Sequence, residues 1–280
     1  MGKLQQEVTQ IAPKTWCISE FRLVNAFLAE GEKKAALIDT GCGLGDISAI
    51  ARTLTDKPIE IFLTHGHADH IGGLYRFTQD TSVYLHPADR VFEKNFPCDN
   101  TFRRGYVQTR GPIRFPGEGN QQAMMELIPE PEPEPIKLSH TNELCDGQRF
   151  DLRGRVLEVL HTPGHSEGSV CFLDAKNRIL FSGDTVNQSI ILMRQPDNDK
   201  RLIRIYHQTL KTIWEKSASY DCLAIGHDGV TIDKQIVKDY LELTDGLLSD
   251  SIVGAYEKVG FRKGEVARLG LAELWYQCDA

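Results

Sequence analysis

Residues 64–73 read Thr-His-Gly-His-Ala-Asp-His-Ile-Gly-Gly, the densest group of metal-binding side-chain types in the chain. Three imidazoles and one carboxylate fall within six residues, after the apolar run 59–63 and before two glycines. A strand that enters a tight loop would turn these side chains toward one point, where a cation could hold them. The stretch predicts a binuclear metal centre. The alternative is a solvated, histidine-rich turn without a ligand, and the rest of the chain must decide between the two.

Length and composition indicate an ordinary globular protein. The chain has 280 residues, enough for one large domain or two small ones with an ample core. Hydrophobic residues make up 41% and charged residues 25%. The net charge of −7 argues against a nucleic-acid surface, which would need a basic stripe. Composition and charge therefore favour a globular protein that binds no nucleic acid, and length leaves one domain or two open.

The cysteines and the N-terminal residues bear on the location of the protein. Seven cysteines, an odd number, are scattered without a CxxC pair, which indicates reduced thiols rather than a disulfide framework. Residues 1–6 contain no apolar segment typical of a secretory signal, and no run approaches the length of a membrane span. These features predict a cytoplasmic protein without a membrane partner.

The first third of the chain is rich in expected strands. Short apolar runs at 15–19, 22–30 and 35–39, each bounded by turn residues, predict a mostly antiparallel sheet. A helix is expected at 46–54, and the buried strand 59–63 leads into the histidine loop. A short helix around residues 71–77, a strand at 82–86 and a helix at 87–96 follow.

Residues 97–135 break this rhythm. They contain several arginines and glycines and end in alternating proline and glutamate, which should form an extended chain. An insertion of this length is usually a functional lid or a disordered link. One interpretation is a surface excursion that could contact a second subunit of a homodimer. The other is a lid whose arginines favour an anionic substrate: Arg103, Arg104, Arg110 and Arg114.

The second half repeats the alternation of strand and helix. The pattern predicts strands at 155–161, 169–173, 178–182 and 221–225, and helices at 202–214, 232–248 and 252–259. Residues 269–276 are ambiguous and could form a last strand. We therefore expect a helical C-terminal extension over about 230–280.

Four of the expected strands end in a loop that carries a metal-binding residue. These loops follow residues 63, 160, 182 and 225, and each contains or adjoins a glycine that allows a sharp turn. Imidazole and carboxylate ligands without thiolate suit zinc, manganese or iron, and the number of histidines favours zinc.

In this order the motifs resemble a known family. His-x-His-x-Asp-His at 65–70, His-Thr-Pro-Gly-His-Ser at 161–166, Ser-Gly-Asp-Thr at 182–185 and Gly-His at 226–227 are similar to the metallo-β-lactamase fold superfamily of hydrolases. The similarity covers about 15–245, and the first two loops are also those of glyoxalase-II-like thioesterases. The resemblance implies a single domain over 1–280, with 97–135 as an insertion, and an α+β fold: a four-layer αβ/βα sandwich of two mixed β-sheets flanked by helices.

The resemblance also implies how the ligands divide between two divalent cations. The number of histidines favours Zn²⁺ for these cations, with Mn²⁺ or Fe²⁺ as alternatives. One metal would be held by His65, His67 and His165, and a second by Asp69, His70 and His227, with Asp184 bridging both. Metal binding lowers the pKa of a shared water from about 15.7 toward 7, which supplies a hydroxide nucleophile. Asp69 would orient this hydroxide, so that Asp69 and Asp184 take the catalytic roles.

The remaining histidines are expected outside the metal centre. The resemblance assigns His161 a structural role, and His86 precedes a proline at a strand end. His140 and His207 are expected at the surface or in the lid, although His207 could line the pocket with its neighbour Tyr206. Asp39 is a candidate to accept the second N–H of a ligating histidine.

An ester, thioester or lactone of a small molecule is the expected substrate. A glutathione-binding region like that of glyoxalase II has no match in 228–280, and Asn187 stands where lactonases often have tyrosine. Antibiotic-cleaving members generally lack a bridging aspartate, so Asp184 disfavours that activity. The arginine-bearing insertion leaves a phosphoester substrate open. A diiron redox protein would typically have glutamate at His67, and nothing favours a metal-binding module without catalysis.

Overall fold

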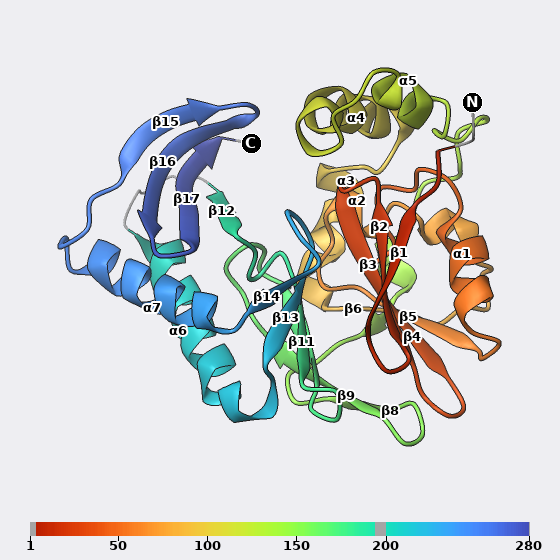
Figure 1. Ribbon diagram of the computed structural model, residues 1–280, viewed down its shortest axis with the longest axis horizontal. Coiled ribbons are helices and arrows are strands. Elements are labelled where there is room, and N and C mark those ends of the chain that lie inside the picture. Colours follow the sequence, from red (N-terminus) through yellow and green to blue (C-terminus); the bar gives the residue numbers. More distant parts are fainter. Residues whose placement is uncertain (1–3, 194–199, 280) are drawn as a thin grey trace.

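The computed structural model describes residues 4–193 and 200–279. Residues 1–3, part of the segment that bears on a secretory signal, lie outside this range. Two β-sheets face each other, with helices on their outer sides (Figure 1). The predicted four-layer α+β sandwich is therefore confirmed. A third, smaller sheet adds to it.

The first sheet has seven strands and is mixed rather than mostly antiparallel. Its first four strands are antiparallel, and its last four are parallel to one another. In spatial order they are β1 (Glu7–Ala12), β2 (Thr15–Glu20), β3 (Val24–Glu30), β4 (Ala35–Ile38), β5 (Ile59–Phe62), β6 (Val83–Leu85) and β7 (Asn142–Glu143).

The second sheet has six strands, in the order β14-β13-β11-β10-β9-β8. Only β11 and β13 are parallel, so their carboxyl ends lie at the same edge of the sheet. The strands are β8 (Arg149–Asp151), β9 (Val156–His161), β10 (Val170–Asp174), β11 (Ile179–Gly183), β13 (Cys222–Ile225) and β14 (Thr231–Asp233).

Aromatic side chains fill the space between the two sheets. The rings of Phe27 and Phe181 lie 5.5 Å apart, and those of Phe62 and Phe172 lie 5.8 Å apart. These four side chains are almost completely buried, and aromatic pairs at such distances add to the apolar free energy of burial. This core fixes the two sheets against each other, so that the loops at one edge of both sheets meet.

Helices cover both outer faces. Helix α1 (Ile47–Leu54) begins at Asp46, whose side chain accepts a hydrogen bond from the Ala49 N–H at 3.0 Å, and it packs on the first sheet. Helices α6 (Arg201–Glu215) and α7 (Gln235–Leu248) pack together on the second sheet. No helix in the described ranges is long and apolar enough to cross a membrane.

Short helices complete the connections. They are α2 (Ala68–Ile71), α3 (Phe92–Asn95) and the 3-10 helices Leu74–Arg76, Pro87–Val91, Leu138–His140 and Ser217–Ser219.

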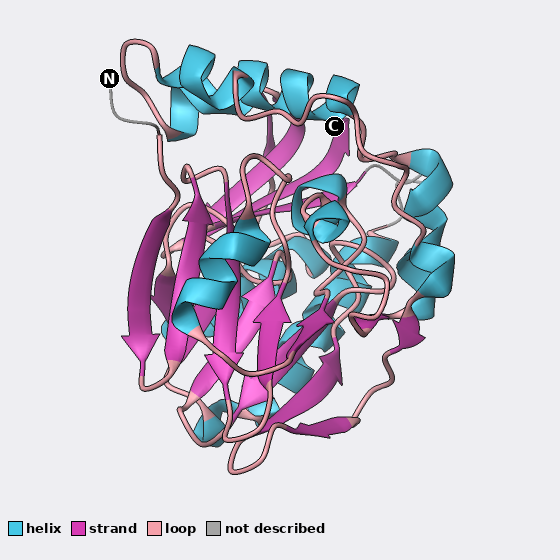
Figure 2. Ribbon diagram, turned by 90° about the vertical axis from the view of Figure 1, so that its right-hand side faces the viewer, coloured by secondary structure: helices cyan, strands magenta, loops and turns pink. Residues whose placement is uncertain are grey.

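The region 97–135 is an ordered helical unit, which the sequence patterns did not predict. Helix α4 (Asn100–Arg114) begins at Asp99 and is followed by α5 (Asn120–Met125). Both lie across one end of the sandwich (Figures 1 and 2), and their buried side chains form a common cluster with Phe21 and Leu23 of the first sheet's loops. The proline–glutamate segment after α5 has no helix or strand, as expected.

The C-terminal extension is mainly a sheet, and the prediction of a helix at 252–259 is wrong. The third sheet has the order β12-β17-β16-β15, with β12 (Ser189–Met193), β15 (Ala255–Val259), β16 (Arg262–Leu269) and β17 (Ala272–Asp279). Gly260 and Gly270 have positive φ of 59° and 56°, which allows the two tight hairpin turns. Residues 255–259 are mostly exposed and pair antiparallel with β16, whose Val266 is buried beside Trp275 of β17, so pairing with this sheet overrides the helix-like pattern.

Candidate metal centre and its cavity

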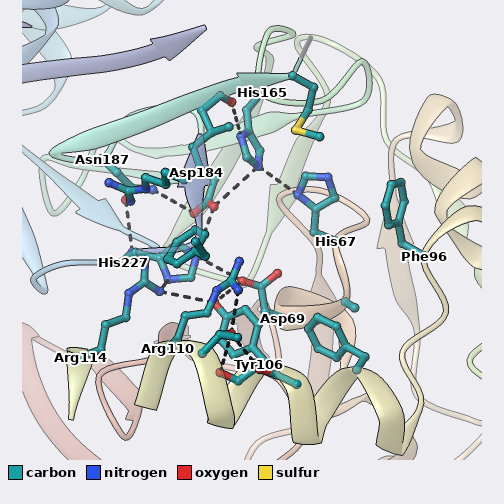
Figure 3. Close-up of a pocket in the computed structure, with 18 of the residues that line it drawn as sticks. His67, Asp69, Phe96, Tyr106, Arg110, Arg114, His165, Asp184, Asn187 and His227 are labelled. Carbon is teal, nitrogen blue, oxygen red and sulfur yellow. Dashed lines mark hydrogen bonds and ion pairs between the residues drawn. The ribbon is translucent and has the colours of Figure 1, made fainter. Parts of the chain in front are cut away.

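The predicted ligand residues come together at one edge of the sandwich (Figure 3). Strand β5 leads to His65 and His67, and helix α2 presents Asp69 and His70 directly afterwards. The loops after β9, β11 and β13 bring His165, Asp184 and His227. A Cβ on Gly226 would lie 2.4 Å from the Asp184 Oδ1 atom, so only glycine allows these loops to approach so closely.

Three imidazoles form the first group of donors. The Nδ1 atom of His67 lies 3.1 Å from Nε2 of His65 and 3.0 Å from Nε2 of His165. Ring nitrogens at such distances can share one proton at most, and the remaining lone pairs repel each other. A cation among them would resolve this repulsion, and three His donors suit a divalent transition metal.

Carboxylates join the second group. The Nε2 atom of His227 lies 3.4 Å from Asp69 Oδ2 and 3.2 Å from Asp184 Oδ2. The Nε2 atom of His70 lies 3.4 Å from Asp184 Oδ1, and that of His165 lies 3.6 Å from Asp184 Oδ2. The carboxylate of Asp184 therefore faces both groups. Ligand atoms of three residue sets lie within 4.8 Å of one another: His65, His67 and His165; His65, His70 and Asp184; Asp69, His70 and His227.

Hydrogen bonds hold the outer nitrogens of the histidine rings. The Nδ1 atom of His70 donates to Asp39 Oδ2 at 2.8 Å, as expected for Asp39. The Nδ1 atom of His165 donates to the carbonyl of Ile191 at 3.0 Å, and that of His227 lies 2.7 Å from the carbonyl of Leu23. Because these oxygens accept only, the Nδ1 atoms of His70 and His165 carry a proton and their Nε2 atoms face the centre. The Nδ1 atom of His227 also lies 2.8 Å from Nη1 of Arg114, which can only donate. This donor set fits a divalent metal.

Burial and charge keep three donors, His65, His67 and Asp184, in the forms that a cation needs. Burial lowers the pKa of His67 to about 3 and holds that of His65 well below its usual value. Burial alone would raise the pKa of Asp184, but His227 and His70 hold it well below the usual range. At neutral pH the imidazoles of His65 and His67 are neutral and the carboxylate of Asp184 is ionised, which is the state that binds metal. Burial alone would lower the pKa of His70 and His227, but Asp184 holds both above the usual value as long as no cation takes the place of the proton.

Asp89 is a site residue that the sequence interpretation missed. Its carboxylate is fully buried and accepts hydrogen bonds from the Gly66 N–H at 2.9 Å, the Ser166 hydroxyl at 2.7 Å and the Gly168 N–H at 2.6 Å. It therefore ties the loop of His65 and His67 to the loop of His165. Nothing in the spacing around Asp89 indicates this role, since its partners are distant in sequence.

The other histidines lie outside the donor groups. His161 stacks on His86 with ring centroids 4.2 Å apart, in agreement with structural roles. His140 is exposed, in a 3-10 helix. His207 is buried between α6 and α7, with Nδ1 2.8 Å from the Thr244 hydroxyl, and Tyr206 donates to the Thr185 carbonyl. The expectation of His207 at the surface or in the lid is therefore wrong. Neither His207 nor Tyr206 lines the cavity, so the alternative for this pair is wrong as well.

Helix α4 supplies a wall of the site, in the region for which the sequence left a lid as one of two interpretations, but the sequence patterns did not indicate that this wall is a helix. Phe102, Tyr106, Arg110 and Arg114 are spaced four residues apart, share one face of the helix and line the cavity. The hydroxyl of Tyr106 donates to Asp69 Oδ2 at 2.7 Å. This spacing was the available signal, but Gly105, Gly111 and Pro112 within the helix disfavoured it.

A cavity of about 620 Å³ adjoins the donor groups, within the usual range for small-molecule sites. Figure 3 shows His67, Asp69, His165, Asp184 and His227 around it, with Phe96 on one side and the α4 residues on another. The third sheet closes it further, through Ile191 of β12 and through Phe261 and Arg262 of the β15–β16 hairpin. Asn187 donates to Asp184 Oδ1 at 3.0 Å.

The arrangement of donors, strands and loops matches a family model. The model described as the metallo-beta-lactamase superfamily covers residues 20–246, most of the chain. The chain belongs to the metallo-beta-lactamase superfamily. Among solved members of the fold, the sec-alkylsulfatase Pisa1 from Pseudomonas sp. aligns with a TM-score of 0.66 at 17% identity, covering 88% of this chain and 42% of that one.

A metallo-beta-lactamase from Pontibacter korlensis aligns with a TM-score of 0.56 at 17% identity, over 86% of this chain and 99% of that one. At such identities the likeness concerns the fold alone. Sequence relatives are nearer. Bovine acyl-coenzyme A thioesterase MBLAC2 is 33% identical over 174 residues, 58% of each chain. Atrochrysone carboxyl ACP thioesterase of Pseudocercospora fijiensis is 26% identical over 224 residues, 79% of this chain and 51% of the relative. The matches thus span little more than half of these relatives' own length.

Proposed function

We propose that this superfamily member is a metal-dependent hydrolase of small-molecule acyl thioesters, with esters and lactones as chemically related substrates. The observation that carries the proposal is the convergence of His and Asp donors at the wall of a largely apolar cavity. The names of two relatives, an acyl-coenzyme A thioesterase and an ACP thioesterase, favour a thioester over the other bonds. An acyl chain fits a cavity lined by Phe96, Phe102 and Ile191.

In this proposal the donors hold two divalent cations, in the first place Zn²⁺. His65, His67 and His165 would hold one, and Asp69, His70 and His227 the other, with Asp184 between them. The distances from Asp184 to histidines of both groups support its bridging role. When bound, the cations would polarise the thioester carbonyl and lower the pKa of a water so that hydroxide is available at neutral pH.

The chain's own residues position this chemistry. Asp39 and the Leu23 carbonyl fix the rings of His70 and His227, so their Nε2 atoms stay directed at the centre. The Tyr106 hydroxyl fixes the carboxylate of Asp69 through Oδ2. Such fixed geometry keeps the nucleophile and the carbonyl aligned without reorganisation during the reaction. The thiolate leaves without a covalent intermediate on the protein.

A phosphoester is the second candidate, because Arg110 and Arg114 line the cavity and arginine pairs well with phosphate oxygens. Elemental analysis of purified protein, followed by rates on a thioester, an ester, a lactone and a phosphodiester, separates the candidates. We expect about two divalent metals per chain and the highest kcat/KM on the thioester. The highest kcat/KM on the phosphodiester would select the second candidate, and a chain that takes up no divalent metal would contradict both.

A further inference from the structure

Arg110 occupies an unusual place in the cavity. Its guanidinium lies between two aromatic rings, 5.0 Å from the ring centroid of Tyr106 and 3.5 Å from that of Phe261. It thus connects helix α4 to the β15–β16 hairpin. Figure 3 shows Arg110 and Tyr106 beside Asp69, and the Tyr106 hydroxyl contacts Asp69 directly. Tyr106 therefore contacts both the guanidinium, through its ring, and one of the donors, through its hydroxyl.

Among the described residues, no carboxylate oxygen lies within 4.0 Å of a guanidinium nitrogen of Arg110. Its one side-chain hydrogen bond to a described residue runs from Nη1 to the Thr109 hydroxyl, at 2.8 Å. The other arginines of the cavity differ. Arg114 pairs with Asp228 at 3.4 Å, and Arg262 pairs with Glu273 at 3.4 Å.

A half-buried guanidinium normally has an anionic partner, because a charge removed from water is costly unless it is paired. The stacked rings hold the group in place, and its remaining N–H donors are available to a ligand in the cavity. Planar guanidinium forms paired hydrogen bonds with carboxylate or phosphate oxygens. The apolar side chains Phe96, Pro97 and Ile191 also line the cavity and suit a hydrocarbon chain.

We infer that Arg110 binds an oxyanion of the substrate that lies outside the scissile bond. This inference rests on the proposed thioesterase function and defines its substrate class as an anionic thioester. The oxyanion has two sources of the same chemistry. It is either a terminal carboxylate of the acyl chain or a phosphate of the thiol carrier.

Three thioesters separate the sources: hexanoyl-N-acetylcysteamine, its adipoyl counterpart and hexanoyl-coenzyme A. The variants are Arg110→Met and, as matched control, Arg104→Met. Arg104 lies on the same helix but is exposed, pairs with Glu130 at 2.5 Å and does not line the cavity. For an acyl carboxylate, Arg110→Met lowers the adipoyl-to-hexanoyl ratio of kcat/KM by about 10- to 100-fold. For a carrier phosphate, the ratio of hexanoyl-coenzyme A to hexanoyl-N-acetylcysteamine falls instead.

Arg110→Lys retains the charge without the planar fork and should recover only part of the affected ratio. If Arg110→Met changes both ratios by no more than Arg104→Met does, the inference is wrong. Calorimetric binding decides the same point without turnover, with adipate against hexanoate and phosphopantothenate against pantothenate. A wild-type protein that cleaves no thioester but binds one of these anions through Arg110 would contradict the proposed function and support the anion site. Equal binding within both pairs would overturn the site.

Discussion

Two regions enclose the cavity, and they are held in different ways. We call the strand-end loops 64–70, 161–168, 183–187 and 226–227 the ligand loops, and helix α4 with the hairpin turn Gly260–Arg262 the cavity cover. The ligand loops are fixed by hydrogen bonds to buried carboxylates, each of which accepts three of them. The carboxylate of Asp39 alone accepts from the Thr64 N–H, the Thr64 hydroxyl and His70, at 2.7–2.8 Å.

Helix α4 is anchored to the first half of the sandwich, where the buried Arg103 donates to the carbonyls of Cys42 and Gly72 at 3.0 and 3.1 Å, but weaker contacts join the two parts of the cavity cover. Its two parts meet through the stacking of Arg110 on Phe261 and through the approach of Gly260 to Ile113. Such contacts contribute about 0.5–2 kcal/mol each, whereas buried charged networks lose several kcal/mol when one partner is removed. From this difference we expect the proposed metal centre to be held rigidly, and selection among substrates to depend on the more easily altered contact between α4 and the hairpin.

The largest expected effect is at the shared ligand. Asp184→Ala removes the carboxylate that faces both donor groups, so the metal content should fall below two per chain. We expect kcat/KM on a thioester to fall on the order of 10³-fold or more. Elemental analysis and initial rates measure both. Asp221→Ala, an exposed residue paired with Arg178, is the control and should change neither. Retention of both metals with full activity would exclude a metal role for Asp184.

A smaller effect is expected at Asp89, which contacts no substrate. Asp89→Asn retains the size of the side chain but cannot accept all three hydrogen bonds that join the two histidine loops. We expect metal affinity to fall about 10- to 100-fold, measured by competition with a chelator. Ser166→Ala removes one of the three partners and should have the weaker effect. If both variants released metal like the wild type, the ligand loops would not depend on this carboxylate.

The comparison also explains what could be predicted from the sequence. The ligand loops depend on short motifs in which donors and glycines follow apolar strands, so their convergence was predictable. Asp39 was also a candidate, since it follows a strand beside the histidine loop. Asp89 was not, because its partners Gly66 and Ser166 lie 23 and 77 residues away, and one sequence carries no signal for such pairs.

The cavity cover was harder to predict, because tertiary packing overrides local propensity there. Gly105, Gly111 and Pro112 weaken the intrinsic helix propensity of α4. The helix forms nonetheless, because Val107 and Met124 are buried in a cluster with the loops of the first sheet. In the C-terminal extension, the apolar pattern of 252–259 is too short to distinguish a helix from a strand. Residues 255–259 form a strand because they pair with β16.

A still smaller effect than at Asp89 is expected where the two parts of the cavity cover meet. Phe261→Ala removes the ring against which Arg110 stacks, so the guanidinium loses its fixed position. We expect KM for an anionic thioester to rise about 3- to 10-fold with kcat nearly unchanged. Combined with Arg110→Met, the loss should be less than the product of the two single effects. The exposed Tyr256→Ala on β15 is the control. A fall in kcat alone would show that the cover acts on the reaction rather than on binding.

The smallest effect concerns His207, which lies outside the ligand loops and the cavity cover. It distinguishes the loss of stability in acid that comes from these two regions from the loss that comes from the rest of the fold. Burial between α6 and α7 lowers the pKa of His207, whereas the unfolded chain takes up this proton near its ordinary value of about 6.5. As the pH falls through 6.5 toward the lower folded pKa, the unfolded state binds more protons and the free energy of unfolding decreases.

His207→Gln can still donate to Thr244 but does not titrate. Urea unfolding at pH 8 and pH 5.5 should therefore show a decrease for the wild type that exceeds that of the variant by less than about 1 kcal/mol. An identical decrease in both proteins would mean that His207 has the same pKa folded and unfolded. Any decrease in the free energy of unfolding that remains in His207→Gln must come from other groups. We expect the ligand loops to contribute most, because burial holds the pKa of His65 well below its usual value. Added Zn²⁺ should reduce that remaining loss, because a bound cation competes with protons for the same nitrogens.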